Sequence, residues 1–261
     1  MLNIKQIIVL CIAKAKHGIK LGIYNFELTG MPAKTAHNKC ILTAGAKTQM
    51  IEISQKGLII TDEAQVDALQ REFAEKSCVI LPRLLEAHLL EKLLLAVDKA
   101  NFEQQKHIDH NEKIFGTDLS IQNRNLALHQ VHFLLNNPQL FKLVEKITQC
   151  KPINGFAGRI YKNMPNTDHK LDWHDDTEDK SRIIAVSMNL SREKFEGGVF
   201  QIRVKGSDEY LREVPCGNTG DMHIFKVSPQ LQHRVKATTG DFPRTAAAGW
   251  FTDEPYTGLK F

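Results

Sequence analysis

The chain has 261 residues, of which 42% are hydrophobic and 25% are charged, and its mean hydropathy is -0.29. These values are ordinary for a globular protein and exclude wholesale disorder. The net charge is +4, with a pI of about 8.7. Such a mild excess falls short of the concentrated Lys/Arg stripe of nucleic-acid-binding domains, so we expect no nucleic-acid partner.

The cysteines are scattered along the chain and include no Cys-x-x-Cys pair; they are Cys11, Cys40, Cys78, Cys150 and Cys216. This spacing argues against a disulfide framework and against a structural zinc site. Isolated cysteines in an odd number are typical of a reducing compartment, so we expect a cytoplasmic protein. The apolar run Ile7–Ala13 is too short to span a bilayer, so we expect no membrane span and interpret the run as an ordinary strand or helix.

Residues 1–60 alternate short apolar stretches with glycines and a proline, and the pattern predicts no particular structure for this N-terminal extension. A helix is predicted to begin near Thr61 and to run to about Lys76. Thr61 or Asp62 can cap the free backbone N–H groups of its first turn. The apolar run Cys78–Leu81, ended by a proline, predicts a short strand.

A longer helix is predicted after Leu84, because leucines at spacings of three and four form one apolar face that must be buried. The residues of this face are Leu85, Leu89, Leu90, Leu93, Leu94 and Val97. Two more helices are predicted at Leu126–Leu135 and Pro138–Thr148, the second with Asn137 as its N-cap. Residues 61–150 are therefore expected to form a helical support region.

After Cys150 short apolar stretches alternate with turn residues, and the pattern predicts about eight strands. The predicted strands are Phe156–Tyr161, Leu171–Asp175, Ile183–Leu190, Val199–Val204, Leu211–Val214, Met222–Val227, His233–Ala237 and Thr245–Phe251. So many short strands indicate a jelly roll or a small barrel. The predicted fold class is α+β with a mainly β core: residues 151–261 form the jelly roll, N-terminal helices buttress it, and residues 61–261 form one domain.

A candidate metal site begins at His174 and Asp176. Alternate side chains of a strand share a face, so the imidazole and the carboxylate are expected to point the same way. A distant second histidine would complete the set of two histidines and one carboxylate that binds non-haem Fe(II). A His-x-Asp triplet alone also occurs by chance in a solvated loop, so the remaining residues decide its meaning.

The distant ligand is predicted to be His233, because Arg244 follows it eleven residues later on a late strand. A guanidinium near the metal could clamp a dicarboxylate through two parallel hydrogen bonds. His223 is the competing candidate, and we interpret it as a packed or surface histidine. The histidines of the helical region lack an acidic partner at metal-site spacing and are interpreted as structural; they are His107, His110, His129 and His132.

These motifs together resemble the prolyl-4-hydroxylase-like branch of the 2-oxoglutarate and Fe(II)-dependent oxygenases. The resemblance covers roughly residues 77–255 and is carried by HDD at 174–176, EGGVFQIR at 196–203, GDMHIF at 220–225, HRV at 233–235 and RTAAAGWF at 244–251. It implies a double-stranded β-helix, the jelly roll already predicted. It also implies that His174, Asp176 and His233 are catalytic iron ligands.

The resemblance further implies that Arg244 binds the remote carboxylate of 2-oxoglutarate and that Tyr161 lines the cosubstrate pocket. Where this branch often has a tyrosine, the chain has Met188-Asn189-Leu190. Asn189 is expected to supply the missing hydrogen bond to the cosubstrate. Some relatives carry Ser or Thr two residues after the arginine, where this chain has Ala246.

The implied activity is hydroxylation of a C–H bond of a peptidyl or small-molecule substrate, with 2-oxoglutarate decarboxylated to succinate and CO2. Its cofactors would be Fe(II), 2-oxoglutarate and O2, with ascorbate as a reductant. Two alternatives remain open at this point. One is a cupin-like metal dioxygenase or isomerase that does not use 2-oxoglutarate, since a fold does not fix a function. The other is a non-catalytic metal-binding module. The identity of the substrate and the oligomeric state are not predicted.

Overall fold

The computed structural model describes residues 10–15, 18–23, 51–109, 111–121 and 125–257. The chain divides into two compact units, residues 1–45 and 46–261. In the first unit, β1 (Leu10–Ala15) and β2 (Gly18–Ile23) form an antiparallel hairpin. The second half of the apolar run at residues 7–13 is thus a strand, while residues 7–9 lie outside the described residues. Most of the predicted N-terminal extension also lies outside them.

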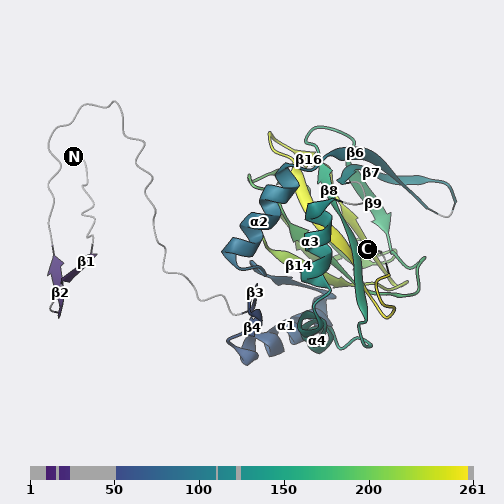
Figure 1. Cartoon of the computed structure of the whole chain (residues 1–261). Helices are drawn as coiled ribbons and strands as arrows, with labels where there is room; N and C mark the ends of the chain where they lie inside the picture. Colours follow the sequence, from purple (N-terminus) through teal and green to yellow (C-terminus); the bar gives the residue numbers. More distant parts are fainter. Residues whose placement is uncertain (1–9, 16–17, 24–50, 110, 122–124, 258–261) are drawn as a thin grey trace, which may run out of the picture. The chain divides into compact units, whose positions relative to one another are not determined.

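The second unit is built on a large, mainly antiparallel sheet in the order β13-β12-β15-β9-β7-β8-β17-β10-β14-β5, with β6 paired to β7. The strands of this sheet are β5 (Cys78–Leu81), β6 (Phe102–Ile108), β7 (Ile114–Ile121), β8 (Gly155–Asn163), β9 (Lys170–His174), β10 (Arg182–Asn189), β12 (Phe200–Val204), β13 (Tyr210–Val214), β14 (Met222–Lys226), β15 (Leu231–Val235) and β17 (Arg244–Thr252). The sheet curls until it is nearly closed into a barrel, which confirms the predicted jelly roll (Figure 1).

The described part of the chain contains four helices, as predicted: α1 (Glu63–Lys76), α2 (Ala87–Asp98), α3 (Leu126–Leu135) and α4 (Pro138–Thr148). Figure 1 shows α2 and α3 on one side of the sheet and α1 and α4 side by side. The Asp62 side chain caps α1 by accepting from the Ala64 N–H at 2.9 Å, and Asn137 caps α4 in the same way. None of the described helices is long and apolar enough to cross a membrane.

The apolar face of α2 is buried as predicted at Leu93, Leu94 and Val97. Leu85 was expected on the same helix but lies two residues before it. There it is buried and forms a parallel bridge with Ile53 of the hairpin β3 (Ile51–Ser54) and β4 (Gly57–Ile60). Residues 51–60 therefore contribute to the same hydrophobic core as the helices, rather than to a separate extension.

Residues 61–150 are less helical than predicted, because β6 and β7 lie within them and β7 pairs with both β8 and β9. Sequence patterns missed these strands because they lack an apolar alternation. The buried residues of β7 include the polar Thr117, Asp118 and Ser120, which period-two hydrophobicity cannot detect.

Strand β10 lies between the helix-side core and the barrel interior and is buried along most of its length. Because successive side chains of a strand point to opposite faces, Ile184, Val186 and Met188 join the core beneath the helices. Ala185 joins the smaller apolar cluster on the other side. Ser187 is expected on the face of Ala185, and both residues line the cavity described below.

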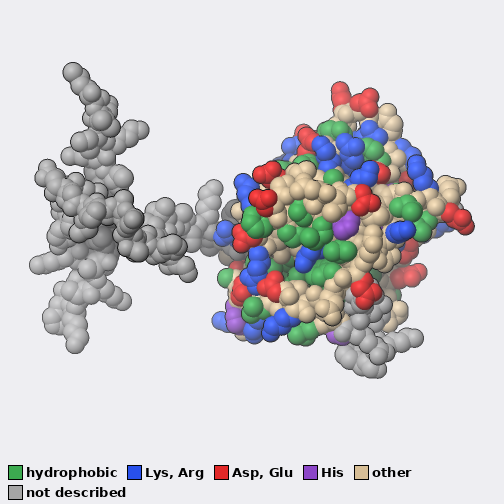
Figure 2. Space-filling model, turned by 90° about the horizontal axis from the view of Figure 1, so that it is seen from above, with side chains coloured by type: hydrophobic (Ala, Val, Ile, Leu, Met, Phe, Trp, Pro, Cys, Tyr) green, Lys and Arg blue, Asp and Glu red, His purple; other side chains and the backbone are tan. Residues whose placement is uncertain are grey.

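Two very short strands, β11 (Glu196–Gly197) and β16 (Thr238–Thr239), pair with each other. Gly197 and Gly198 both adopt positive φ, a conformation that glycine reaches without steric cost. On the face of the molecule shown in Figure 2, Lys and Arg side chains lie among Asp and Glu side chains.

Candidate metal centre

Two histidines of the predicted triad face each other across neighbouring antiparallel strands. His174 is the last residue of β9 and His233 lies in the middle of β15, and the two are direct Cα partners. Their ring centroids are 4.1 Å apart. The register of the two strands therefore brings together side chains that are 59 residues apart in the sequence.

Asp176 reaches the histidines by a turn rather than by strand alternation, which corrects the predicted reason for its position. Strand β9 ends at His174, and Asp176 has a left-handed backbone with φ 60°. Its carboxylate lies 3.5 Å from His174 Nε2 through Oδ1 and 3.2 Å from His233 Nε2 through Oδ2. Positive φ is uncommon for residues other than glycine and often marks a functional site.

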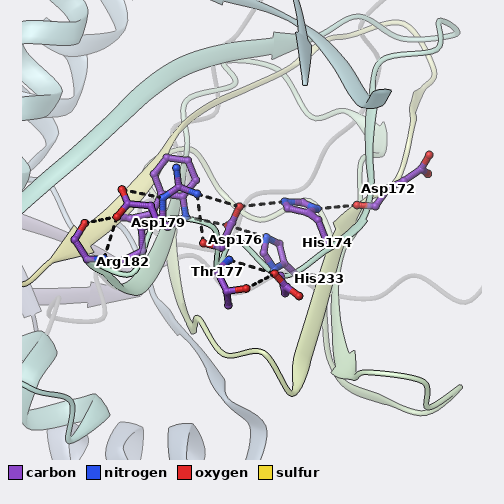
Figure 3. Close-up of polar contacts among 10 residues, drawn as sticks. Asp172, His174, Asp176, Thr177, Asp179, Arg182 and His233 are labelled. Atoms are coloured by element: carbon purple, nitrogen blue, oxygen red, sulfur yellow. Dashed lines mark hydrogen bonds and ion pairs between the residues drawn. The ribbon is translucent and has the colours of Figure 1, made fainter. Parts of the chain in front are cut away.

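The two imidazoles and the carboxylate converge on one point (Figure 3). One ligand atom from each residue lies within 4.8 Å of the others, and all three side chains are at most 15% exposed. Two histidines and one carboxylate are the set that holds non-haem Fe(II) with open positions for further ligands, so the donor set fits this metal. Within the described residues His223 does not belong to this group.

The surroundings of His174 and Asp176 favour the protonation states that a metal requires of these two residues. His174 Nδ1 donates to the Asp172 carbonyl at 2.7 Å, which leaves the Nε2 lone pair for a metal. Burial, followed by the nearby His233, lowers the pKa of His174 to about 4. Burial alone would raise the pKa of Asp176, but the two histidines and a hydrogen bond from Trp250 lower it overall.

Two side chains that the sequence did not single out as partners hold Asp176 in place. Trp250 Nε1 donates to Asp176 Oδ2 at 2.9 Å. Arg182 Nη1 donates to the Asp176 carbonyl at 3.3 Å, and its guanidinium lies 3.7 Å from the centre of the Trp250 ring. Figure 3 shows Arg182 on the side of Asp176 away from His174. These contacts fix the left-handed turn that brings the carboxylate to the site.

Arg244 and Tyr161 lie in the same cavity as the triad, which has a volume of about 640 Å³. Arg244 is buried and donates hydrogen bonds to the Tyr161 hydroxyl and to Ser187 Oγ, the latter at 3.3 Å. In the sheet order, β9, β7 and β8 separate its strand, β17, from β15. The guanidinium thus reaches the cavity from a distant part of the curved sheet and not from the neighbour of His233, as the chain order had suggested.

Asn189 was predicted to bind the cosubstrate, but it lies outside the cavity that contains the triad. Its amide donates to the carbonyls of Gly217 and Asn218 and accepts from the Ser191 N–H, so it orders the loop before β14. Ser187, two residues earlier on β10, stands beside Arg244 instead. Asn189 and Arg244 nevertheless line a second, smaller cavity together, and the role of Asn189 toward the cosubstrate stays a prediction.

A polar network beside the triad was also missed. Asp118 is fully buried and accepts hydrogen bonds from His107 Nε2, Ser120 Oγ and Arg159 Nη1, each at 2.9 Å. Burial would raise the pKa of Asp118, but the hydrogen bond from His107 and the charge of Arg159 lower it overall. His107, interpreted as a structural residue of a helical region, lies on β6 and lines the cavity with Arg159.

Comparisons with known proteins agree with this geometry. Residues 159–252 match the model of the 2OG-Fe(II) oxygenase superfamily, a segment that contains the triad, Arg244 and Tyr161. No curated protein matches the sequence of this chain.

Several solved structures share the fold. An oxidoreductase of the 2OG-Fe(II) oxygenase family from Burkholderia pseudomallei has a TM-score of 0.57 at 15% identity, covering 74% of this chain and 93% of that one. A prolyl hydroxylase from Trichoplax adhaerens, in complex with a hypoxia inducible factor peptide fragment, has a TM-score of 0.55 at 13% identity. The match covers 73% of this chain and 90% of that one. The α-ketoglutarate-dependent epimerase SnoN of nogalamycin biosynthesis has a TM-score of 0.56 at 14% identity. The match covers 77% of this chain and 89% of that one.

Because the identities are low, the solved structures support the fold, whereas the family model and the clustered His-Asp-His side chains support the chemistry. The match over residues 159–252 therefore supports the 2OG-Fe(II) oxygenase superfamily, a class of oxidoreductases that use Fe(II) and 2-oxoglutarate, for the segment that contains the metal centre.

Proposed function

We propose that this protein is a dioxygenase that hydroxylates a C–H bond of a peptidyl or small-molecule substrate, with Fe(II) held by His174, Asp176 and His233. One observation carries the proposal: the triad and the buried Arg244 line a single cavity of about 640 Å³. A metal and a dicarboxylate can therefore lie side by side within it.

The triad supplies two imidazole nitrogen donors and one carboxylate oxygen donor. The hydrogen bond from His174 Nδ1 to the Asp172 carbonyl and the low pKa of His174 keep its Nε2 available for a metal at neutral pH. Asp176 stays ionised because its pKa is lowered. The three residues would hold a metal, and a donor set of two histidines and one carboxylate leaves positions open for further ligands.

Arg244 is placed to bind the remote carboxylate of 2-oxoglutarate. Its planar guanidinium can make two parallel hydrogen bonds to a carboxylate. Tyr161 and Ser187 already contact the guanidinium and limit its orientation. When bound, Fe(II), 2-oxoglutarate and O2 supply the oxidising chemistry, in which the keto acid becomes succinate and CO2 and the substrate gains one oxygen atom.

Aromatic and polar side chains form the wall of the cavity around the triad. The Phe115 ring lies 4.9 Å from the His174 ring, and the Phe225 ring lies 4.6 Å from the His233 ring. The cavity is also lined by the polar residues His107 and Arg159. A mixed apolar and polar wall suits a substrate with a C–H group near the metal and polar groups farther out.

The relatives differ in substrate: the prolyl hydroxylase was crystallised with a peptide fragment, and the epimerase with nogalamycin RO. The test therefore begins without a substrate. Iron-loaded protein and 2-oxoglutarate should yield succinate slowly, and Asp176→Ala should abolish it. Lysate fractions of peptides and of metabolites are then added separately, and an accelerated reaction should give a product heavier by one oxygen atom.

Two outcomes would count against hydroxylation. Succinate formed together with an isomer of the substrate, without added mass, would indicate epimerisation. Iron binding at the triad with no consumption of 2-oxoglutarate would instead favour a cupin-like enzyme or a binding module.

A further inference from the structure

We propose that His223 is a further cosubstrate-binding residue, which donates a hydrogen bond from Nε2 to the remote carboxylate of 2-oxoglutarate beside Arg244. The inference rests on the proposed binding of that carboxylate by Arg244. It concerns a histidine that the metal site does not use and that the sequence left as a packed or surface residue.

His223 lies next to the residues that hold Arg244. It is on β14, where its Cα partner is Ser187 of β10. Ser187 Oγ accepts a hydrogen bond from Arg244 Nη2 at 3.3 Å, and both His223 and Arg244 line the cavity of the triad. Burial, then the charge of Arg244, then that of His233 lower the pKa of His223 to about 3. The imidazole is therefore neutral and can donate through one nitrogen without adding a second positive charge.

The Nε2 atom of His223 is buried and has no hydrogen-bond partner among the described residues. The side chain lies beside two aromatic rings, with the Phe200 centroid at 4.6 Å and the Phe225 centroid at 5.9 Å. Neither ring offers an acceptor for an imidazole N–H. Buried polar groups are nearly always hydrogen-bonded, so an orphan atom in a cavity wall indicates a missing partner.

Another buried histidine shows what a structural role looks like in this fold. His132 on α3 is 4% exposed, compared with 8% for His223. Its Nε2, however, lies 2.9 Å from the Gly158 carbonyl oxygen, which accepts from it. His132 does not line the cavity. The two histidines are alike in burial and differ in whether the protein itself supplies a partner.

A carboxylate can accept a hydrogen bond from the unpaired N–H of His223. Its two oxygens offer about four acceptor sites. A single guanidinium cannot occupy all of them. The Tyr161 and Ser187 hydroxyls, which touch Arg244, can supply further donors, and His223 would supply another from the opposite strand. Because the carboxylate accepts, the proton of the neutral imidazole must lie on Nε2. His223 would therefore help to set the position of the remote carboxylate. The distance from this position to the metal would determine the length of the keto acid that can bind.

The test compares His223→Leu with the matched control His132→Leu. Leucine fills a similar space without a polar group, so His223→Leu should keep or raise the Tm of the ligand-free protein, since an unpaired buried N–H is removed. His132→Leu should lower the Tm, because the Gly158 carbonyl loses its donor. A fall in Tm for His223→Leu as large as that for His132→Leu would assign His223 a structural role.

Ligand binding is then measured by calorimetry on Mn(II)-loaded protein without oxygen. His223→Leu should weaken 2-oxoglutarate binding about tenfold or more, the usual effect of losing a hydrogen bond to a charged group. It should leave the affinities for Mn(II) and for pyruvate unchanged, because pyruvate has no remote carboxylate. His132→Leu should change none of these affinities. His223→Gln retains a donor and should recover part of the loss, and it serves as the test variant if His223→Leu does not fold.

A spectroscopic readout does not depend on substitution. In the Zn(II) protein with ¹⁵N-labelled histidine, 2-oxoglutarate should shift the Nε2 resonance of His223, and pyruvate should leave it in place. Unchanged 2-oxoglutarate binding in His223→Leu, with a large loss in Arg244→Ala, would overturn the role of His223 alone. Unchanged binding in both variants would overturn the proposed carboxylate site itself.

Discussion

His174 and His233 are direct partners across β9 and β15, and their rings lie 4.1 Å apart. The strand register itself therefore forms the two-histidine half of the metal site. Asp176 is added from the turn that follows β9, where Trp250 and Arg182 hold it. The predictions below test this division of roles.

Removing a ligand should abolish tight iron binding. For His174→Ala, Asp176→Ala or His233→Ala we expect Fe(II) affinity to fall by more than about 100-fold, since losing groups that only orient a ligand already costs about 10–100-fold. His223→Ala is the control and should bind Fe(II) like the unmodified protein. Competition titration with a chelator measures the Fe(II) affinity of the ligand variants and of the control. The opposite result for His233→Ala and His223→Ala would mean that the wrong histidine has been assigned to the metal.

Trp250→Phe should weaken iron binding while leaving the fold intact. The variant keeps the ring under Arg182 but loses the N–H that donates to Asp176 Oδ2, so we expect a loss of about 10–100-fold in Fe(II) affinity. Trp173→Phe is the matched control, because Trp173 lines the same cavity and stacks on Arg203 without a hydrogen bond to the triad. Equal affinities for the two variants would show that the bond from Trp250 does not orient the ligand.

Arg244→Ala should raise the apparent KM for 2-oxoglutarate while iron remains bound. A carboxylate left without its buried partner costs on the order of 3–5 kcal/mol. Arg244→Lys keeps the charge but loses the fork and should be intermediate. Uncoupled succinate formation gives KM without knowledge of the substrate. A KM equal to that of the unmodified protein in Arg244→Ala would leave this arginine a structural role only.

The stability of the metal-free protein should fall as the pH is lowered from about 6.5 toward 4. Burial lowers the pKa of His174 to about 4 and that of His223 to about 3, whereas in the unfolded chain both have pKa values near 6.5. In that window the unfolded state binds more protons, so stability rises with pH and is lost on acidification. Urea midpoints at several pH values measure the slope. The stability of His223→Leu should depend less steeply on pH than that of the unmodified protein. Equal slopes for the two proteins would contradict the contribution of His223.

The helix α2 should stabilise the barrel without taking part in metal binding. Leu93 is 1% exposed and Leu95 on the same helix is 48% exposed. Leu93→Ala should lower the free energy of unfolding by about 2–5 kcal/mol, the usual cost of a cavity in a core. Leu95→Ala should change it by no more than about 0.5 kcal/mol. Below their melting temperatures both variants should bind Fe(II) normally, and loss of iron binding in folded Leu93→Ala would contradict the purely supporting role.

Much of this protein could be predicted from its sequence, because the signals involved are local. Asp62 and Asn137 cap their helices through backbone N–H groups two residues away. The helical spacing of the apolar residues around Leu93 is enough to predict a buried helix face. The order of His174, Asp176, His233 and Arg244 indicated the chemistry, since residue type and sequence resemblance identify a donor set before its geometry is known.

Only the tertiary structure decided how those residues meet. The left-handed turn at Asp176, the register that sets His174 opposite His233, and the choice of Ser187 over Asn189 beside Arg244 all depend on contacts between distant segments. The strands β6 and β7 escaped prediction for the same reason. The carboxylate of Asp118 can be buried because Arg159 and His107, which lie on other strands, form hydrogen bonds with it. A period of apolar residues reports burial by the hydrophobic effect, whereas burial of a paired charge depends on partners that the local sequence does not contain.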